Sequence, residues 1–171
     1  RKNKQSQTYG IGLKEVWNLQ KENSSPGSVM HTVGWPLTNN VYGGSFFYQL
    51  DDSKASIGFV IGLDYENPYL NPYKEFQKFK THPKIKKILK GGKRISYGAR
   101  AINEGGIQSL PKMTFPGGFI IGCDAGTLNV PKIKGSHNAM KSGMIAAEVC
   151  HTELRNNLDY GKELNSFSKA F

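Results

Sequence analysis

The sequence predicts an α+β fold, in which an antiparallel sheet is accompanied by helices and a further strand and helix close a second unit. Four segments with strand-like patterns follow one another within residues 9–63. Two short amphipathic helical patterns come next, within residues 71–90. A strand, a glycine-rich turn, a loop and a helix are then predicted within residues 116–149. Strands that are grouped in sequence and followed by helices are typical of α+β proteins.

The predicted strands are apolar or alternating runs bounded by turn residues. They are Tyr9–Trp17, Ser28–Trp35, Tyr42–Leu50, Ser56–Leu63 and Arg94–Ala101. Residues 51–54 are typical of a turn, so the third and fourth strands are expected to form an antiparallel hairpin. The first strand contains Gly-Ile-Gly, but no third glycine and no helix follow it, so it does not fit a dinucleotide-binding fingerprint.

Two short helices are predicted between the fourth and fifth strands. In Asn71–Lys80, the aromatic residues Tyr73, Phe76 and Phe79 recur at helical spacing and are expected to share one face. The second helix, Pro83–Lys90, begins with a proline and is followed by two glycines, which suit the two ends of a helix. Its apolar residues are expected to face inward. Its lysines are expected to face solvent, and they are Lys84, Lys86, Lys87 and Lys90.

The chain has 171 residues and a formal net charge of +10, enough for one domain or parts of two. We interpret the basic residues as spread along the chain, mostly on a solvated surface, with anionic lipid or an acidic protein as alternative partners. Because no recognition motif is present, nucleic acid is not an expected partner. No run of about 18 apolar residues predicts a membrane-spanning helix. The chain does not begin with Met, so we expect an internal fragment or a processed chain.

No residue is predicted to be catalytic or to bind a metal. The two cysteines, Cys123 and Cys150, lack the spacing of metal ligands and are expected to be free thiols in a reducing compartment. An iron–sulfur cluster held within this chain is excluded, because it needs about four thiolates. No Ser–His–Asp set or pair of catalytic carboxylates is recognisable.

The stretch that organises the chain is residues 116–149. A short strand is predicted at Phe119–Ile121, with Asp124 at its carboxyl end, and a helix is predicted at Ser136–Val149 with Ser136 as its cap. Small residues in the turn between them leave the backbone bare, which suits either a tight turn or the close approach of a large ligand. These residues are Gly122, Ala125 and Gly126.

The start of the predicted helix is a candidate site for an electron-rich group, because its free N–H donors and its dipole point there. The residues at this position are Gly135, Ser136, His137 and Asn138. Asp124 is a candidate to accept a hydrogen bond from a ligand hydroxyl, with a role in the turn as the alternative. We assign no acid–base role to His137, since a histidine near a helix start is more often on the surface.

Several unusual segments occur in one order along the chain. They are HTVGWPL (31–37), YGGSF (42–46), GLDYENPYLNPY (62–73), EFQKFKTHP (75–83), GGKRISYGARAINEGG (91–106), GCDAG (122–126), NVPKIKG (129–135) and HNAMKSGMIAAE (137–148). Together they resemble the electron-transfer flavoprotein–ubiquinone oxidoreductase family over about residues 9–150. The last three segments resemble the second flavin-binding motif of FAD-dependent oxidoreductases.

The resemblance implies two ligand sites. FAD is expected at the residues already singled out at the turn and the helix start, namely Gly122, Asp124, Ala125, Gly126, Gly135, Ser136, His137 and Asn138. Ubiquinone is expected at Gly43 and Gly44, two glycines inside an otherwise bulky strand, for which a strand bulge is the alternative. The neighbouring aromatic residues Tyr42, Phe46, Phe47 and Tyr48 suit a quinone or an ordinary core equally.

The resemblance also divides the chain. Residues 1–27 are expected to end a segment of the FAD domain, residues 28–105 to form a ubiquinone-binding α+β module, and residues 106–150 to supply the closing strand and helix of the Rossmann-like FAD domain. Residues 151–171 are expected to be a membrane-proximal tail. The half of the FAD domain with the GxGxxG motif, and the [4Fe–4S] module, are expected outside this chain.

The function that the resemblance implies is that of a membrane-associated enzyme, an electron-transferring-flavoprotein dehydrogenase. Electrons would pass from reduced electron-transfer flavoprotein through FAD to ubiquinone. The location would be one leaflet of the mitochondrial inner membrane or the bacterial cytoplasmic membrane, without spanning it. Two alternatives are a flavoenzyme of the geranylgeranyl-reductase type, and a basic domain that docks on membranes and is not an enzyme.

Overall fold

The structure is a computed structural model, and it describes residues 4–156 and 161–171. The chain forms two compact units. One comprises Gly10–Ile102 and is called the sheet unit here. The other comprises Arg1–Tyr9 and Asn103–Phe171 and is called the α4 unit. Each unit is described by itself.

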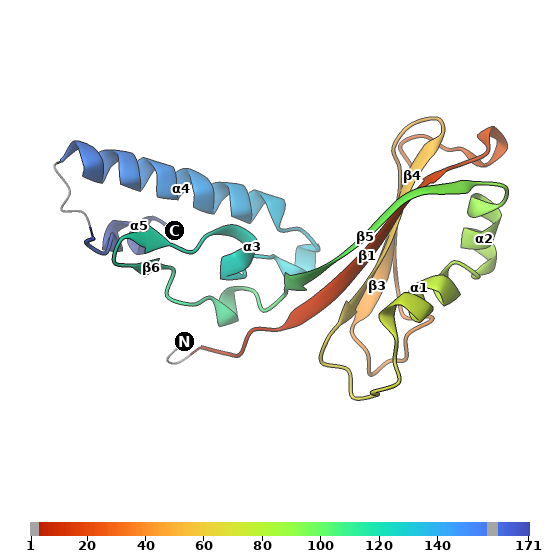
Figure 1. Ribbon diagram of the computed structural model, residues 1–171, viewed down its shortest axis with the longest axis horizontal. Helices are drawn as coiled ribbons and strands as arrows, with labels where there is room; N and C mark the ends of the chain where they lie inside the picture. Colours follow the sequence, from red (N-terminus) through yellow and green to blue (C-terminus); the bar gives the residue numbers. More distant parts are fainter. Residues whose placement is uncertain (1–3, 157–160) are drawn as a thin grey trace. The chain divides into compact units, whose positions relative to one another are not determined.

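The sheet unit is built on five strands, which lie in the order β2-β3-β4-β1-β5 (Figure 1). They are β1 (Tyr9–Asn18), β2 (Val29–Val33), β3 (Gly43–Gln49), β4 (Lys54–Gly62) and β5 (Lys93–Asn103). All five predicted strands are therefore confirmed, with ends that differ by a few residues. β3 and β4 pair antiparallel, which confirms the predicted hairpin. In its turn, backbone hydrogen bonds from Ser53 and Lys54 lower the pKa of Asp51 to about 2.

The two predicted helices are also confirmed, as α1 (Pro72–Phe79) and α2 (Pro83–Leu89). They cover one face of the sheet (Figure 1). Phe76 and Phe79 of α1 are buried against Phe59 of β4, with ring centroids 6.2 and 5.5 Å apart. Tyr73 differs from the prediction, because half of it is exposed while the two phenylalanines are buried. Two of the three aromatic residues therefore anchor α1 to the sheet.

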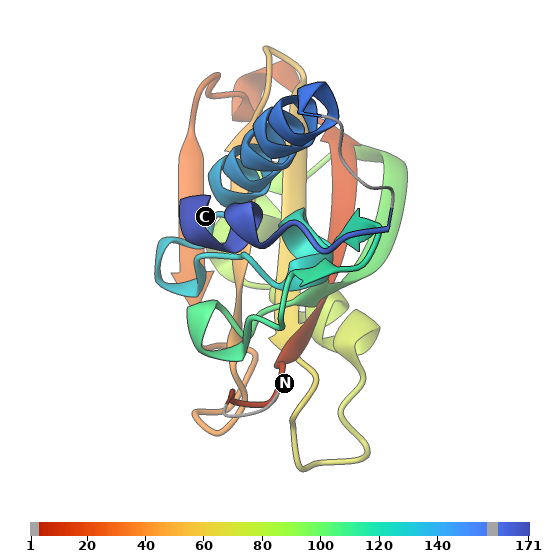
Figure 2. The same cartoon turned by 90° about the vertical axis from the view of Figure 1, so that its left-hand side faces the viewer.

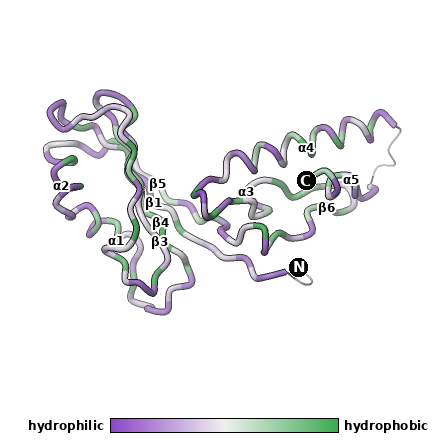
Figure 3. Tube along the Cα trace, turned by 180° about the vertical axis from the view of Figure 1, so that it is seen from behind, coloured by the Kyte–Doolittle hydropathy of each residue, from purple (hydrophilic) through white to green (hydrophobic). Residues whose placement is uncertain are grey.

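The α4 unit consists of short elements and one long helix. The short elements are η2 (Ile107–Ser109), β6 (Thr114–Phe115), β7 (Gly118–Phe119), α3 (Gly122–Ala125), η3 (Val130–Lys132) and α5 (Asn165–Ala170). The 3-10 helix η1 (Lys21–Asn23) is part of the sheet unit. The long helix is α4 (Ser136–Arg155), which packs on α3 and α5. It lies above α5 in the views of Figure 1 and Figure 2. Along it, hydrophilic and hydrophobic stretches alternate, as an amphipathic helix requires (Figure 3).

Three sequence predictions in this unit need correction. The strand predicted at Phe119–Ile121 is only the two-residue β7, which pairs with β6 in a small hairpin. Helix α4 continues to Arg155 instead of ending at Val149. Ser136 is the first residue of the helix and not its cap, because the N-cap position is occupied by Gly135.

The expected tail is a structural part of the unit. Its first residues extend α4, and residues 165–170 form α5. Phe167 of α5 is fully buried, with its ring 5.0 Å from Phe119 and 5.8 Å from Phe171. These contacts bury the apolar side of the six-residue helix α5 in the unit. The region is thus a docked helix, and only residues 157–160 lie outside the described residues.

The predicted boundary of the α+β module at residue 28 also shifts. β1 lies between β4 and β5 in the sheet, and the sheet unit therefore begins at Gly10. In sequence, β1 is separated from the other strands by a loop, so only its pairing with β4 reveals that it belongs to the same sheet. The end of the unit at Ile102 lies close to the predicted boundary at residue 105.

Candidate functional site

The first turn of α4 presents unused backbone donors. The N-cap residue Gly135 has no side chain to cap the helix, and its carbonyl accepts the first intrahelical hydrogen bond, from Ala139 N at 2.9 Å. The amides of Ser136, His137 and Asn138 donate to no group within residues 4–156 and 161–171. A helix of 20 residues concentrates partial positive charge at this end, so the turn suits an anionic or electron-rich ligand.

The two ends of the crossover between Ile121 and Ser136 lie together. Gly122 has a φ of 64° and donates its N–H to the buried Ser142 Oγ on α4, at 3.0 Å. A Cβ on Gly122 would lie 3.6 Å from the Cβ of Ala139. A Cβ at this position would thus be in ordinary van der Waals contact with Ala139, and the positive φ is what favours glycine here.

The remaining small residues of the turn are enclosed by the chain itself. Ala125 is fully buried. Gly126 has a φ of 89° and ends α3, and the side chain of Gln7 occupies the space that a Cβ on Gly126 would need. At Gly135, a Cβ would lie 3.0 Å from Leu128 Cδ1. The identity of these residues is thus explained by packing and backbone conformation, and their contact with a ligand stays a prediction.

The polar candidates differ in their environment. Asp124, Ser136 and His137 are exposed, and the carboxylate of Asp124 has no hydrogen-bond partner among the described residues. Asn138 is half-buried and donates from Nδ2 to the carbonyl of Thr127 at 2.8 Å. That bond ties the first turn of α4 to the loop that precedes it. Asp124 is thus available to a ligand, whereas Asn138 already has a structural role.

A cavity of about 710 Å³ lies beside this loop. Its walls come from the turn 104–108, the loop 127–131 and the side chains of Leu110, Asn138, Lys141 and Phe171. Of the residues predicted to bind FAD, all of which the structure describes, Asn138 lines this cavity. The volume is in the range of pockets that bind cofactors and drug-sized ligands. Mixed apolar and polar walls suit an aromatic ring with polar edges.

The loop beside the cavity is closed on itself and strained. Asn129 and Lys134 form a pair of backbone hydrogen bonds of 3.0 and 3.3 Å. Ile133 adopts a φ of 54°, a left-handed conformation that β-branched residues rarely occupy. Strained residues of this kind are concentrated at ligand-binding sites. Sequence reasoning did not predict this conformation, because an isoleucine gives no signal of a positive φ.

The two glycines expected at the quinone site face opposite sides of the sheet. Gly43 pairs with Ile61 and lies on the helix-covered side, where a Cβ would collide with Leu37 and with the backbone of β4. Gly44 lies on the side without helices, where a Cβ would collide with the carbonyl of Thr32. Consecutive strand residues must alternate in this way. Their glycine identity is explained by sheet packing, and a quinone contact at either stays a prediction.

The helix-free face around Gly44 is apolar and aromatic. Val33 of β2 lies opposite Gly44 and is 84% exposed. Phe46 stacks on Tyr48 with ring centroids 4.9 Å apart, and its ring lies over Gly58, where a Cβ would collide with it. Phe47 is 4% exposed and belongs to the core beneath the helices. The aromatic run of β3 thus divides between a core face and an open face.

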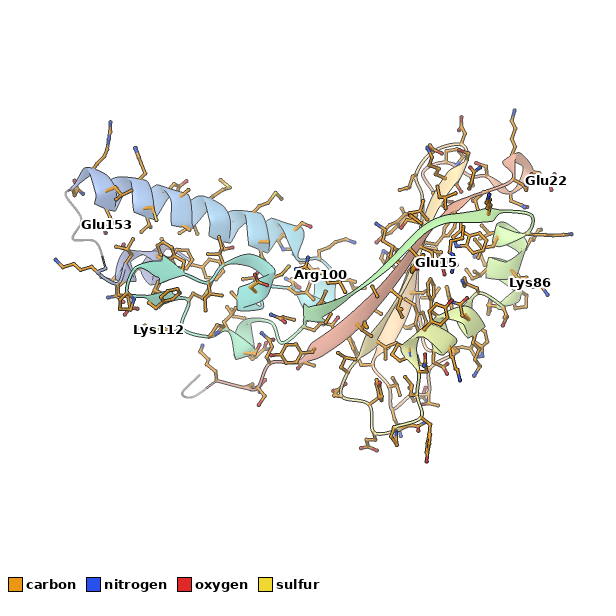
Figure 4. All side chains as sticks on the ribbon, in the orientation of Figure 1. Glu15, Glu22, Lys86, Arg100, Lys112 and Glu153 are labelled. Carbon is orange, nitrogen blue, oxygen red and sulfur yellow. The ribbon has the colours of Figure 1, made fainter. Side chains whose placement is uncertain are left out.

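The sheet unit also contains a buried carboxylate that no sequence pattern predicts. Glu15 of β1 is 2% exposed and lies between the sheet and the helices (Figure 4). It accepts hydrogen bonds from Lys80 Nζ at 2.8 and 2.9 Å, Trp17 Nε1 at 2.7 Å and Arg94 Nη1 at 3.1 Å. Burial alone would raise the pKa of Glu15, but the hydrogen bonds from Lys80, Trp17 and Arg94 outweigh it and hold the pKa below 4.5. The partners are far apart in sequence, so no local pattern reveals them.

No group of three or more potential metal-binding side chains occurs among residues 4–156 and 161–171. Cys123 is exposed, Cys150 is partly buried and both are free. Asn103, the last residue of β5, donates to the carbonyls of Cys123 and Asp124 at 2.9 and 3.3 Å, which is a structural role at α3. Among the residues described, no helix is both long and apolar enough to span a bilayer.

The sheet unit matches a known protein family. Residues 9–102 match the family model described as "ETF-QO, ubiquinone-binding". The chain belongs to the electron transfer flavoprotein–ubiquinone oxidoreductase family. The match coincides with the sheet unit and not with the α4 unit.

Relatives within this family cover both units. The mitochondrial electron transfer flavoprotein–ubiquinone oxidoreductase of Caenorhabditis elegans is 65% identical over 144 residues, which is 82% of this chain and 24% of the relative. The protein of the same name from Rattus norvegicus is 60% identical over 151 residues, or 87% of this chain and 24% of the relative. The chain thus spans about a quarter of the length of these curated relatives.

Among solved structures, a geranylgeranyl bacteriochlorophyll reductase-like protein from Thermoplasma acidophilum has a TM-score of 0.72 to this chain. The superposed region comprises 99% of this chain and 38% of the Thermoplasma acidophilum chain, and the two sequences are 19% identical. This likeness shows that the chain has the fold of part of that protein. The predicted α+β class is confirmed, together with the resemblance to the ETF-QO family.

Proposed function

We propose that this chain is part of a membrane-associated flavoprotein that passes electrons from reduced electron transfer flavoprotein through FAD to ubiquinone. The observation that carries the flavin half of the proposal is the uncapped start of α4 close to a cavity of about 710 Å³. The family match of the sheet unit supports the quinone half. Because the chain spans about a quarter of its relatives, the activity belongs to the longer protein.

In this proposal the flavin ring lies near the first turn of α4. FAD, when bound, supplies the reversible uptake and release of electrons. The amides of Ser136, His137 and Asn138 would stabilise negative charge on the reduced ring by about 1 kcal/mol through the helix dipole. The exposed carboxylate of Asp124 would accept a hydrogen bond from the ribityl chain. Gly122, Ala125, Gly126 and Gly135 would bring the backbone close to the cofactor.

The quinone would bind at the open face of the sheet around Gly44. A flat apolar ring would fit beside Val33 and Phe46, and Gly44, which is partly exposed, adds no side chain to that face. Gly43 would act through its backbone only, because its Cα faces the opposite side. In this proposal Gly43 is required for packing of the sheet, and Gly44 contacts the quinone.

The remaining parts of the proposal concern the longer protein. A [4Fe–4S] cluster would lie outside this chain, whose two cysteines are too few to hold it. The relatives are named mitochondrial, which supports the mitochondrial inner membrane as the location, or the cytoplasmic membrane in a bacterium. The protein would associate with one leaflet and bind electron transfer flavoprotein at its surface.

The quinone site is tested by placing a charge beside it in the full-length protein. Val33→Asp adds a carboxylate opposite Gly44 at a position that is 84% exposed, so the fold should tolerate it. A charge next to an apolar ligand costs at least about 1.4 kcal/mol, which is tenfold in affinity. We expect the KM for ubiquinone to rise about tenfold, with unchanged flavin content and unchanged reduction by electron transfer flavoprotein.

The matched control is Val29→Asp, which lies on the same strand and the same face and is 65% exposed. Four residues separate the two positions, or about 13 Å along a strand. We expect the control to change the KM less than twofold. Equal effects of the two variants would contradict a site at Gly44, and a full-length protein that purifies without FAD would contradict the flavin half.

A flavoenzyme of the geranylgeranyl-reductase type remains a second candidate, because the fold likeness to such a protein is extensive. Quinone-dependent reoxidation of the bound flavin distinguishes the two, since it is expected for the first candidate only. Flavin absorbance separates both from a basic membrane-docking domain that is not an enzyme.

A further inference from the structure

The helix-free face of the sheet carries a pair of polar rings beside its apolar residues. His31 of β2 lies close to Tyr48 of β3, with its Nε2 3.2 Å from Tyr48 Oη and the ring centroids 5.5 Å apart, edge to face. Both side chains point to the same face as Val33 and Gly44, since side chains alternate along each strand. A polar contact thus lies within the face at which the quinone is proposed to bind.

This pair is not needed to build the core of the sheet unit. β2 is an edge strand of the sheet, and His31 is exposed on it. The core lies on the opposite face, where α1 and α2 cover the sheet. An exposed hydrogen bond between side chains contributes little to stability, because water competes for both partners. Stability therefore does not explain why a histidine and a tyrosine meet at this position.

The contact with Tyr48 orients the imidazole and leaves its other nitrogen unused. Among residues 4–156 and 161–171, Nδ1 of His31 forms no hydrogen bond. When the ring is protonated, Nε2–H donates to Tyr48 Oη and Nδ1–H is left for an external acceptor. When Nδ1 has lost its proton, the same Nε2–H still donates to Tyr48. The ring is therefore held in one orientation both before and after it gives up a proton.

His31 lies within reach of a ligand placed over Gly44. It is directly opposite Phe46 in the pairing of β2 with β3, two residues from the level of Gly44, which is roughly 7 Å along a strand. The ring of Phe46 lies over Gly58 of β4, on the side away from β2. A quinone over Gly44 with its carbonyl axis along the strands therefore presents one oxygen to His31.

The charged side chains on this face of β1 to β4 lie apart from His31. The strand that pairs with β2 is β3, whose titratable residue on this face is Tyr48. On β4 and β1 the alternation places Lys54 and Lys14 here. Lys54 is at the end of β4, where its ammonium pairs with Asp51 at 3.4 Å. Lys14 lies three strands from β2, or roughly 14 Å, which exceeds the Debye length of about 10 Å.

Reduction of a quinone requires protons as well as electrons. Ubiquinone takes up two electrons and two protons, and a new O–H bond forms at each of its carbonyl oxygens. In the proposed function the electrons come from the reduced flavin, but Gly43 and Gly44 have no side chains that could donate a proton. Histidine is the side chain that most often transfers protons near neutral pH.

We propose that His31 is a catalytic residue that protonates one carbonyl oxygen of ubiquinone during its reduction, and that Tyr48 positions the imidazole. The proton leaves Nδ1 of the protonated ring and forms an O–H bond at the quinone oxygen, on which the electrons from the flavin place negative charge. The neutral ring then takes up a proton from water, to which His31 is exposed. The second proton comes from solvent. The inference rests on the proposed function, because it deepens the quinone site placed at Gly44.

The test follows reoxidation of the pre-reduced flavin by saturating short-chain ubiquinone, in single turnovers of the full-length protein. His31→Gln keeps a polar side chain but cannot carry the proton. We expect reoxidation to slow about tenfold at about pH 6, less than is usual for a general acid, because water reaches the site. The wild-type rate should fall between about pH 6 and 8, where histidines lose their proton, and the variant rate should stay constant.

Binding without turnover separates proton transfer from a structural role. The affinity of His31→Gln for oxidised short-chain ubiquinone, measured by equilibrium dialysis without reductant, should change less than about twofold, because the proton is needed only during reduction. Tyr48→Phe keeps the ring that stacks on Phe46 and removes the hydroxyl. It should slow reoxidation about threefold and keep the pH dependence, since one hydrogen bond that orients the donor is lost.

The matched control is His82→Gln, which replaces the second histidine of the sheet unit, exposed beside Trp35. It should change neither the rate nor its pH dependence. Equal slowing in the two histidine variants, or a wild-type pH dependence in His31→Gln, would overturn the proposal. Equal losses and flat pH profiles in Tyr48→Phe and His31→Gln would make the tyrosine the donor and overturn the assignment to His31.

The failure of this inference and the failure of the proposed function give different results. If Val33→Asp raises the KM for ubiquinone but His31→Gln is reoxidised at the wild-type rate, proton donation by His31 fails and the quinone site stands. If Val33→Asp has no effect on the KM, the quinone site at Gly44 fails, and the inference fails with it.

Discussion

The buried carboxylate of Glu15 provides the sharpest prediction about stability. Glu15→Gln keeps the volume of the side chain but removes the charge that faces Lys80, which is only 12% exposed. Breaking a buried ion pair by removing one partner costs about 3 to 5 kcal/mol. Arg94 is 40% exposed, so solvent screens its share. We therefore expect a loss of about 3 kcal/mol at pH 7, the lower end of that range.

The assay is urea unfolding followed by tryptophan fluorescence, which is informative because Trp17 donates to this carboxylate. The pH dependence follows from the lowered pKa of Glu15. A carboxylate with a lowered folded-state pKa stabilises the fold fully above its unfolded value of 4.5, and this contribution is lost as the pH falls through the folded-state value. The difference between wild type and variant should be constant from pH 6 to 8 and shrink below pH 4.5.

Two comparisons sharpen the result. Glu22→Gln neutralises an exposed glutamate of η1 and should change the free energy of unfolding by less than about 0.5 kcal/mol. The double variant Glu15→Gln, Lys80→Met should be more stable than the sum of the single variants, because it leaves no unpaired buried charge. A loss below about 1 kcal/mol for Glu15→Gln, or a difference that does not depend on pH, would refute the reasoning.

Two other predictions concern the α4 unit. Phe167→Ala should destabilise it by about 3 to 5 kcal/mol because the ring is fully buried, whereas Phe171→Ala, at 43% exposure, should cost less than half as much in urea unfolding. Equal losses would show that α5 is not docked through Phe167. Gly126→Ala should cost at least about 1 kcal/mol because Gly126 has a φ of 89°. A neutral result in thermal unfolding would contradict that backbone conformation.

Local patterns predicted most elements of the sheet unit. Alternation of apolar residues identified the strands, because a residue spacing of two is a property of the extended backbone. Phe76 and Phe79 identified the inner face of α1 for the corresponding reason in helices. Patterns failed where an element is short or is held by distant contacts. The buried Phe167 belongs to a six-residue helix in a polar segment, and β7 has only two residues.

The candidate sites show the same division. The start of α4 and the small residues around Gly122 were recognisable in sequence, because glycines and a helix start are local features. The opposite orientation of Gly43 and Gly44 followed only from the pairing of β3 with β4. Composition revealed that the chain is basic, but a groove lined by lysines appeared only when α1, α2 and Trp17 were brought together.

The sequence by itself determined the family of this protein, the class of its fold and the strands and the two longer helices of the sheet unit. Only the tertiary structure decided that Glu15 is buried among Lys80, Trp17 and Arg94, and that the lysines of α2 surround a groove. The physical reason is that secondary structure depends on residues within a few positions of one another. Burial and charge pairing depend on distant residues, and the ion pair between Glu15 and Arg94 joins positions 79 residues apart.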